Sequence, residues 1–231
     1  MAGGWGRVGL SIVFLESSLE LVPRDLWRHP QVVRSSERYG IEPWEMVLDK
    51  SLHYNAMSGL SQKWKRGRPD ILHTSLLVVS DTPLYNEGLL RVYFQSYDGR
   101  IFSVRPGVRV PKHYERFKGL MAQLLRVGRV PPSGSPLIEV CAQSLQEFVG
   151  RYGRLLLLDE GGEPSTPIEI AAKAISSGGI VGIGAFPRGP FKRSTLRKAA
   201  SRHSILGGRP LKTWGVAGRI VWALERLAGL S

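Results

Sequence analysis

The apolar positions of this chain fall into short continuous runs and into stretches with helical spacing. A continuous run between turn residues predicts a buried strand. Four such runs are Leu10–Leu15, His73–Ser80, Leu155–Leu158 and Ile180–Ala185. Apolar residues three and four positions apart predict an amphipathic helix over about 114–126, and a second one marked by Val216, Ile220, Leu224 and Leu227.

Punctuating residues and spacing predict the remaining elements. Pro167 begins and Gly178 follows a predicted helix at Pro167–Ser177. Further helices are predicted over 24–39, 45–60 and 193–202, the last of them basic. Strands that alternate with helices in the second half predict an α/β fold, with a mostly parallel sheet and helices on both faces.

The stretch between residues 89 and 104 predicts a β-hairpin. Tyr97-Asp98-Gly99 stands between Leu90–Gln95 and Arg100–Val104, and Asp-Gly between such runs is typical of a hairpin turn. The Pro- and Gly-rich segment Val130–Pro136 predicts a loop. We expect one large domain over residues 1–231, since 231 residues suffice to bury a core.

The charge of the chain favours an anionic partner. The net charge is +13, and 23 arginines outnumber 9 lysines. Arginine binds phosphate with two donors and stacks on bases, so its excess favours RNA over a protein that is merely well solvated. A solvated surface of the kind found in thermophiles is the alternative.

Other residue types narrow the class of protein. Cys141 is the single cysteine, which excludes disulfides within the chain and cysteine zinc sites. The histidines have no metal-ligand spacing, so we expect no metal; they are His29, His53, His73, His113 and His203. No apolar run is long enough for a membrane span, and Met1–Arg7 does not have the pattern of a signal peptide. We therefore expect a cytoplasmic protein without membrane contact.

Two turns rich in glycine and proline follow apolar segments in the second half, Gly184–Gly189 and Leu206–Leu211. Ligands in open α/β sheets bind at the carboxyl ends of strands, and glycine lets the backbone approach them closely. Together with the end of Leu155–Leu158, these turns are compatible with a small-molecule site. They are equally compatible with ordinary connections.

Basic residues gather around the predicted hairpin: Arg66, Arg68, Arg105, Arg109, Lys112 and Arg116. Aromatic residues are interleaved with them between Val108 and Phe117, as is common on RNA-binding surfaces. Asp70 follows Arg68 across Pro69 and can hold its guanidinium in a two-point pair. The alternative is a solvated face with surface ion pairs.

Several of these motifs resemble one known family. Arg68-Pro-Asp70 with Asp81-Thr-Pro-Leu84, Val108–Pro111, Arg116–Leu125 and the two turns follow the order found in the pseudouridine N1-methyltransferases of small-subunit ribosome biogenesis. Phe14–Val22 resembles the opening strand of that family. The resemblance covers about residues 9–226.

The resemblance implies a SPOUT-type trefoil-knotted sheet, a homodimer and S-adenosylmethionine as cofactor, with an RNA-binding hairpin and helix insertion at about 63–125. The implied cofactor contacts are Leu157 or its neighbour Leu156, Gly184, Gly189, Leu206, Gly207, Gly208, Arg209, Pro210 and Leu211. The implied contacts to small-subunit rRNA are Arg68, Asp70, Arg109, Lys112 and Arg116, and the catalytic group is unknown, with Asp70 and Arg68 as the best candidates for positioning.

The implied reaction methylates N1 of a pseudouridine in small-subunit rRNA. The alternatives are a non-catalytic rRNA-binding assembly factor and a SPOUT enzyme acting on tRNA. For the homodimer, the apolar stripe Val216, Ile220 and Leu224, with Trp214 and Trp222 nearby, is a candidate interface. The same stripe could instead pack on its own sheet.

Overall fold

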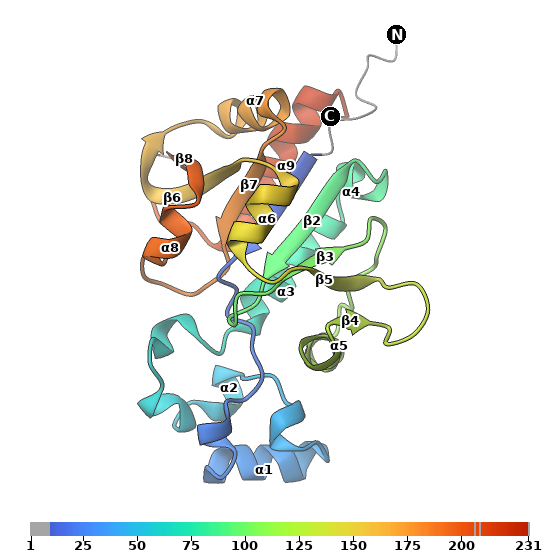
Figure 1. Cartoon of the computed structure of the whole chain (residues 1–231), viewed down its shortest axis with the longest axis vertical. Helices are drawn as coiled ribbons and strands as arrows, with labels where there is room; N and C mark the ends of the chain where they lie inside the picture. Colours follow the sequence, from blue (N-terminus) through green and yellow to red (C-terminus); the bar gives the residue numbers. More distant parts are fainter. Residues whose placement is uncertain (1–9, 206, 208, 231) are drawn as a thin grey trace.

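The computed structural model describes residues 10–205, 207 and 209–230. It contains one sheet of eight strands, in the order β4-β5-β3-β2-β1-β7-β6-β8 (Figure 1). The strands are β1 (Leu10–Leu15), β2 (Leu90–Gln95), β3 (Ile101–Val104), β4 (Arg129–Val130), β5 (Ile138–Ala142), β6 (Leu155–Pro164), β7 (Ile180–Gly184) and β8 (Ala199–Ser204). Most of the predicted strands and the hairpin β2–β3 are therefore confirmed.

The sheet has a parallel and an antiparallel half. β1 pairs in parallel with both β2 and β7, with Ile12 opposite Val92 on one side and Val181 on the other. β6 continues the parallel half between β7 and β8. β3, β5 and β4 add antiparallel pairs at the other edge. The carboxyl ends of β1, β6 and β7 consequently meet on one side of the sheet.

Helices cover both faces of the sheet, as predicted. They are α3 (Pro69–Ser80), α4 (Pro83–Asn86), α5 (Tyr114–Val127), α6 (Leu145–Tyr152), α7 (Pro167–Ser177), α8 (Arg193–Leu196) and α9 (Thr213–Ala228). Ile12 and Phe14 face the core beneath α3, α5, α7 and α9, whereas Val13 and Leu15 face a second core beneath α6. All of β1 is buried because both of its faces are covered.

A smaller lobe between β1 and α3 lies beyond the end of the sheet (Figure 1). It contains α1 (Pro30–Tyr39), α2 (Lys50–His53) and the 3-10 turns Arg24–Leu26, Pro43–Glu45, Ala56–Gly59 and Lys63–Lys65. Its own apolar cluster includes Val32, Leu48 and Met57. The helix predicted over 45–60 is broken here, because the Gln31 side chain accepts hydrogen bonds from the backbone of Asn55 and Ala56 and holds a turn.

Two predictions of element type were wrong. His73–Ser80 belongs to helix α3, which begins at Pro69 and is buried on most sides. A short run that is apolar all round does not distinguish a buried helix from a buried strand. The basic helix predicted over 193–202 ends after one turn, at Leu196, and the chain continues into β8. β8 pairs only with β6, so the edge position accommodates its polar residues.

The apolar stripe of α9 packs inside the molecule. Ile220 and Leu224 are fully buried in the main core, and Val216 is partly buried against it. The stripe is therefore not a free surface, and this finding corrects its assignment as the candidate dimer interface. Trp222 on the same helix remains 52% exposed.

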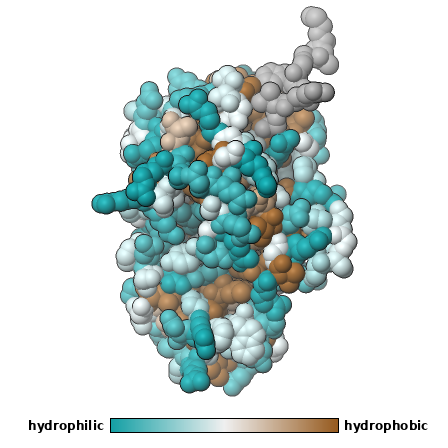
Figure 2. All heavy atoms as spheres, in the orientation of Figure 1, coloured by the Kyte–Doolittle hydropathy of each residue, from teal (hydrophilic) through white to brown (hydrophobic). Residues whose placement is uncertain are grey.

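Figure 2 shows hydrophilic residues over most of one face of the molecule, with smaller apolar patches between them. No helix in residues 10–205 or 209–230 has the length and apolar character needed to cross a membrane. The trefoil knot stays a prediction.

Candidate functional site

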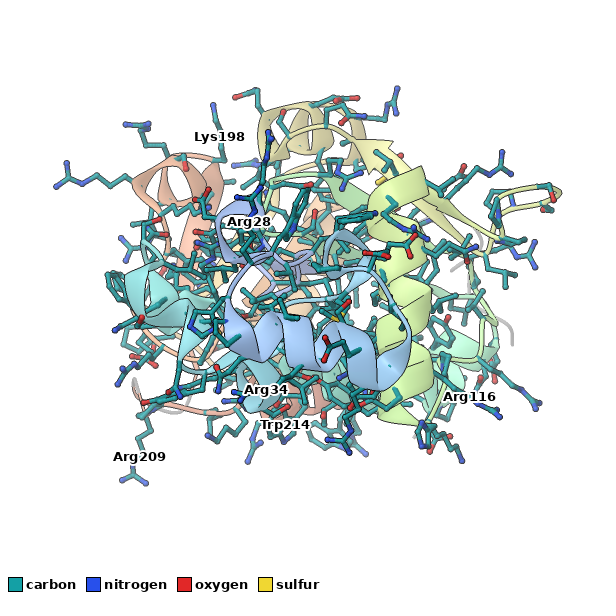
Figure 3. All side chains as sticks on the ribbon, turned by 90° about the horizontal axis from the view of Figure 1, so that it is seen from below. Arg28, Arg34, Arg116, Lys198, Arg209 and Trp214 are labelled. Atoms are coloured by element: carbon teal, nitrogen blue, oxygen red, sulfur yellow. The ribbon has the colours of Figure 1, made fainter. Side chains whose placement is uncertain are left out.

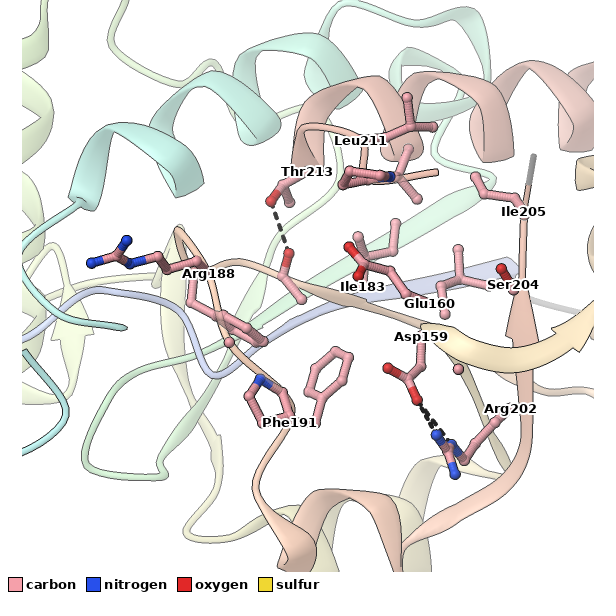
Figure 4. Close-up of a pocket in the computed structure, with 18 of the residues that line it drawn as sticks. Asp159, Glu160, Ile183, Arg188, Phe191, Arg202, Ser204, Ile205, Leu211 and Thr213 are labelled. Atoms are coloured by element: carbon pink, nitrogen blue, oxygen red, sulfur yellow. Dashed lines mark hydrogen bonds and ion pairs between the residues drawn. The ribbon is translucent and has the colours of Figure 1, made fainter. Parts of the chain in front are cut away.

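A cleft of about 1080 Å³ lies at the carboxyl ends of β6 and β7 (Figure 4). Three stretches of chain line it, within 158–161, 183–191 and 202–213, together with Leu196 and Val216. A cavity of this size takes a ligand of nucleoside dimensions or larger, since ligand sites commonly measure about 300–1,000 Å³. The position agrees with the general rule for ligands of open α/β sheets.

The walls of the cleft combine apolar side chains with a few fixed polar groups. The apolar side chains are those of Leu158, Ile183, Phe186, Phe191, Leu196, Ile205, Leu211 and Val216. Thr213 Oγ1 donates to the carbonyl oxygen of Gly184 at 2.8 Å and so ties the start of α9 to the end of β7. Arg202 pairs with Asp159 at the wall of the cleft, and the side chain of Glu160 lies on the side of Ile183 (Figure 4).

The cleft requires glycine at two of the predicted positions. A Cβ on Gly184 would lie 2.9 Å from Phe191 Cζ and 3.0 Å from Phe186 Cε1, closer than carbon atoms pack. Gly189 has a φ of 96°, in the left-handed region that other residues rarely adopt. Both glycines keep the loop of residues 184–191 folded back along the cleft.

The structure brings most of the predicted cofactor residues together. Gly184, Gly189, Arg209, Pro210 and Leu211 line the cleft. The side chains of Leu156 and Leu157 instead lie in the two cores, and the next residue of the strand, Leu158, lines the cleft. Gly207 is exposed and outside the lining. Leu206 and Gly208 lie outside the described residues.

A buried carboxylate lies behind the loop of residues 184–191. Glu16 follows β1, and its Oε2 lies 2.6 Å from Lys65 Nζ while its Oε1 accepts from the Lys192 backbone and from Thr195 Oγ1, both at 2.8 Å. Lys65 Nζ also lies 3.9 Å from the centre of the Phe186 ring. Glu16 thereby joins the end of β1, the turn at Lys63–Lys65 and the far end of the cleft loop.

Ser18 provides a second connection between the cleft loop and the segment at Arg68. Its backbone nitrogen donates to the carbonyl oxygen of Ala185 at 3.0 Å, and its Oγ accepts from the backbone nitrogen of Arg68 at 2.9 Å. Arg68 therefore lies beside the end of β7, although 117 positions separate it from Ala185. The predicted RNA segment and the predicted cofactor loop are neighbours.

Arg68 and Asp70 form the two-point pair that their spacing predicts. Arg68 Nε donates to Asp70 Oδ1 at 2.7 Å and its NH2 donates to Oδ2 at 2.6 Å. The hydrogen bond with Asp70 raises the pKa of Arg68 above its ordinary value. Their side chains are 38% and 39% exposed, so the pair holds the guanidinium in one orientation while leaving part of it accessible.

Arg109, Lys112 and Arg116 lie exposed on the lead-in to α5 and its first turn. His73 Nε2 donates to the carbonyl oxygen of Pro111 at 2.7 Å and stacks on Phe117, which fixes this lead-in against α3. Seen from the end of the molecule that carries α1, the Arg116 and Arg209 side chains point outward on different sides (Figure 3).

Arg66 does not belong to the exposed basic set, which corrects the interpretation of the sequence. It is 7% exposed and forms a two-point pair with Glu20, at 2.7 and 2.6 Å, while its guanidinium lies over the Tyr97 ring. Its role in the structure is to anchor the turn before Arg68. Arg105 remains exposed and donates to Ser135 Oγ.

Asp49 connects the small lobe to α5. Its Oδ2 lies 3.0 Å from both Tyr114 Oη and Lys118 Nζ, and its Oδ1 accepts from Ser51. Burial opposes its ionisation, but the bonds from Ser51 and the Lys118 ammonium lower its pKa below the ordinary value. Burial and the Asp49 charge raise the pKa of Tyr114, which keeps it a hydrogen-bond donor.

Sequence reasoning missed Glu16, Ser18, Lys65 and Thr213 as parts of this site. The signal available for Glu16 was its place, a lone carboxylate directly after a buried strand. The others depend on contacts between distant segments. In the part of the chain that the structure describes, no three His, Cys, Asp or Glu residues are grouped as metal ligands.

A sheet of this order, with two loops around a cleft at its strand ends, defines the chain as an α/β protein of the SPOUT methyltransferase class. The chain belongs to the EMG1/NEP1 methyltransferase family, whose sequence profile matches residues 12–225. That match covers nearly all of the described residues.

Individual relatives agree with this assignment. The chain is 65% identical over 219 residues to the ribosomal RNA small subunit methyltransferase Nep1 of Aeropyrum pernix. The aligned region covers 94% of this chain and 98% of that protein. It is 43% identical over 221 residues to the protein of the same name from Staphylothermus marinus, covering 94% and 96%. The crystal structure of Archaeoglobus fulgidus Nep1 bound to S-adenosylhomocysteine matches with a TM-score of 0.85 and 35% identity, over 96% of this chain and 99% of that one.

Proposed function

We propose that this protein transfers the methyl group of S-adenosylmethionine to N1 of a pseudouridine in small-subunit rRNA. The observation that carries the proposal is the joining of two sites: the cleft loop and the Arg68–Asp70 pair are connected through Ser18. Family membership supports methyl transfer, and the names of the relatives support small-subunit rRNA as the substrate.

The cleft fits the cofactor in size and character. Apolar side chains such as Ile183, Ile205 and Leu211 can enclose an adenine ring, and the backbone of the two loops offers amides and carbonyls to its polar edge. Asp159 and Glu160 supply carboxylate oxygens that can accept hydrogen bonds from hydroxyl or ammonium groups. The relative bound to S-adenosylhomocysteine supports the same ligand here.

When bound, S-adenosylmethionine supplies a methyl group on a sulfonium; transfer to N1 forms an N–C bond, breaks the S–CH₃ bond and leaves S-adenosylhomocysteine, while the N1 proton passes to water. The protein contributes chiefly orientation, which is worth about 7–11 kcal/mol in favourable cases. The carboxylates nearest to the two joined sites are already engaged, since Asp70 is paired with Arg68 and Glu16 with Lys65. Water as proton acceptor is consistent with that arrangement.

The exposed basic residues serve to hold the RNA substrate. A base within folded RNA must be extruded before it reaches the methyl group, at a cost of a few kcal/mol. Contacts from Arg68, Arg109, Lys112 and Arg116 to phosphates offset that cost. We assign RNA binding to the segment at about 63–125, whose strands β2 and β3 are integrated into the common sheet.

Two further features complete the proposal. The protein works in the cytoplasm as a homodimer, and the half-exposed Trp222 is the residue we assign to the dimer contact in place of the buried stripe. It also takes part in assembly of the small ribosomal subunit, through the same RNA surface that serves catalysis.

Labelled methyl transfer tests the proposal against its alternatives. The protein is incubated with labelled S-adenosylmethionine and either an rRNA hairpin or a tRNA, each containing pseudouridine. We expect label in the hairpin. Tight hairpin binding without label would instead indicate a non-catalytic assembly factor, and label confined to tRNA would indicate another target.

Cofactor binding is measured separately by calorimetry. One S-adenosylhomocysteine should bind per chain, with an affinity that a chelator does not change. Absence of binding at millimolar concentration would contradict the proposal.

A further inference from the structure

The turn at Lys63–Lys65 and the residue after it distribute their side chains in an unusual way. Lys65 and Arg66 are 5% and 7% exposed, whereas the large apolar Trp64 is 46% exposed. Charged side chains normally face water and tryptophan normally packs inside, so this inversion is informative. The fold holds the indole at the surface.

Several contacts hold the turn in place. Lys65 is bound to Glu16 and Arg66 to Glu20, so the two residues after Trp64 are anchored in the interior. The residue before the turn, Gln62, has a φ of 49°, and Glu16 has a φ of 50°. They are the two non-glycine residues in the described part of the chain with left-handed backbone, and such strain is commonly retained where function requires it.

The indole lies against the rim of the cleft. A Cβ built on Gly189, a lining residue, would be 3.2 Å from Trp64 Nε1 and 3.3 Å from Trp64 Cδ1. Arg68, next to the cleft loop through Ser18, follows four positions later in the chain. Trp64 therefore lies beside Gly189 at the rim of the cleft, on the segment that leads to Arg68, with almost half of its surface accessible.

We infer that Trp64 is the platform on which the nucleotide entering the cleft stacks. The inference rests on the function proposed above and names a specificity residue for it. An extruded base loses its stacking partners within the RNA, and an aromatic side chain at the rim replaces one of them. The exposed cations Lys63 and Arg188 lie in the same two segments and suit an approaching phosphate.

Three variants test the role of Trp64: Trp64→Ala, Trp64→Phe and the matched control Trp44→Ala. Trp44 has the same 46% exposure but packs beside Trp27 in the small lobe. The probe is an RNA hairpin with pseudouridine at the target position and 2-aminopurine next to it. Its affinity and fluorescence are measured with protein saturated with S-adenosylhomocysteine, so the result does not depend on turnover.

Trp64→Ala should weaken hairpin binding by about 5- to 100-fold and abolish the rise in 2-aminopurine fluorescence that extrusion of the neighbouring target base causes. Trp64→Phe should recover most of the affinity, and Trp44→Ala should match the unaltered protein. Affinity for S-adenosylhomocysteine and oligomeric state should not change in any variant, and each variant should remain folded at the temperature of the assay. All of these results concern binding of the hairpin, and none depends on methyl transfer.

Normal hairpin affinity in Trp64→Ala would overturn the inference, as would an equal loss in Trp44→Ala. A change in oligomeric state confined to Trp64→Ala would also overturn it, because the indole would then be a subunit contact. The proposed function fails in a different way. If the unaltered protein binds the hairpin but transfers no methyl group, the proposed function is wrong, and the binding data still show whether a nucleotide stacks on Trp64.

Discussion

The carboxylate of Glu16 and the ammonium group of Lys65 lie 2.6 Å apart, with side chains only 4% and 6% exposed. The pair spans 49 positions of sequence and joins the end of the central strand to the turn that precedes Arg68. Through Lys192 and Thr195 the same carboxylate also holds the chain beyond the cleft loop. One buried ion pair thus fixes the cofactor side and the RNA side of the site relative to each other.

Removing one partner of this pair should cost more than removing both. Glu16→Gln leaves the buried Lys65 ammonium unpaired, and we expect a loss of about 3–5 kcal/mol in the free energy of unfolding. Lys65→Met should cost less, because Glu16 keeps its bonds from Lys192 and Thr195. Urea unfolding of both single variants and the double variant measures the coupling. Strictly additive losses would contradict the pairing described here.

The glycines of the cleft loop should be needed for cofactor binding. Gly184→Ala introduces a Cβ 2.9 Å from Phe191 Cζ, and Gly189→Ala forces alanine into a φ of 96°. We expect each variant to weaken S-adenosylhomocysteine binding about tenfold or more in calorimetry. Gly150→Ala in helix α6 is the control: a Cβ there meets nothing within 4 Å, so it should stabilise the protein by about 0.5–1 kcal/mol. Unchanged affinity in the loop variants would rule out a close backbone approach at this site.

Neutralising Arg68, Arg109 or Arg116 should weaken RNA binding without affecting the cofactor. Each lost phosphate contact should make the slope of log affinity against log salt concentration shallower by about 0.7–0.9. Asp70→Ala should behave as a milder Arg68→Ala, because it removes the brace and leaves the guanidinium. Arg151→Ala, on α6 at the other face of the sheet, removes the same charge and should have little effect.

Melting temperature separates this account from a purely structural role for the Arg68–Asp70 pair. A structural role predicts that both variants lose thermal stability and cofactor affinity together. Normal hairpin affinity in a well-folded Arg68→Ala protein would exclude this segment as the RNA contact.

His53 should make the stability of the small lobe sensitive to acid. Burial lowers the pKa of His53 to about 4, and its Nε2 has no hydrogen-bond partner. Between that value and the unfolded value of about 6.5, the unfolded chain binds a proton that the folded chain does not, so stability falls as pH falls through this window. The expected loss between pH 7 and pH 5 is about 2 kcal/mol.

Urea unfolding at both pH values checks the effect of His53. His53→Asn keeps an acceptor for the Asp49 backbone nitrogen but cannot take up the proton, so its loss should be smaller by about that amount. An equal pH dependence in both proteins would assign the effect to other groups.

The sequence pattern was enough to predict the type and position of elements that have one apolar and one polar side. α5 lies where its helical spacing places it, and α7 begins and ends at the residues that Pro167 and Gly178 indicate. α3 was misassigned because it is covered on most sides and therefore lacks a polar face. β8 was misassigned because a strand at the edge of a sheet can carry the residues of a basic helix.

The site was predictable where its chemistry is local in sequence. Arg68 and Asp70 are two positions apart, and the glycines of the cleft loop mark a close approach of the backbone. The burial of Lys65 and Arg66 was not predictable, since their partners Glu16 and Glu20 are 49 and 46 positions away. For the same reason, the exposure of Trp64 became visible only in the folded chain.

The most direct test of the central claim compares two hairpins that differ only at the target position, one with uridine and one with pseudouridine. Each is incubated with the protein and labelled S-adenosylmethionine, digested to nucleosides and analysed by mass spectrometry. Uridine has no free N1, because N1 forms its glycosidic bond, whereas pseudouridine has an N1–H. We expect one labelled N1-methylpseudouridine per pseudouridine hairpin and no label in the uridine hairpin. Equal labelling of the two hairpins, or a methyl group at any other position of the base, would contradict it.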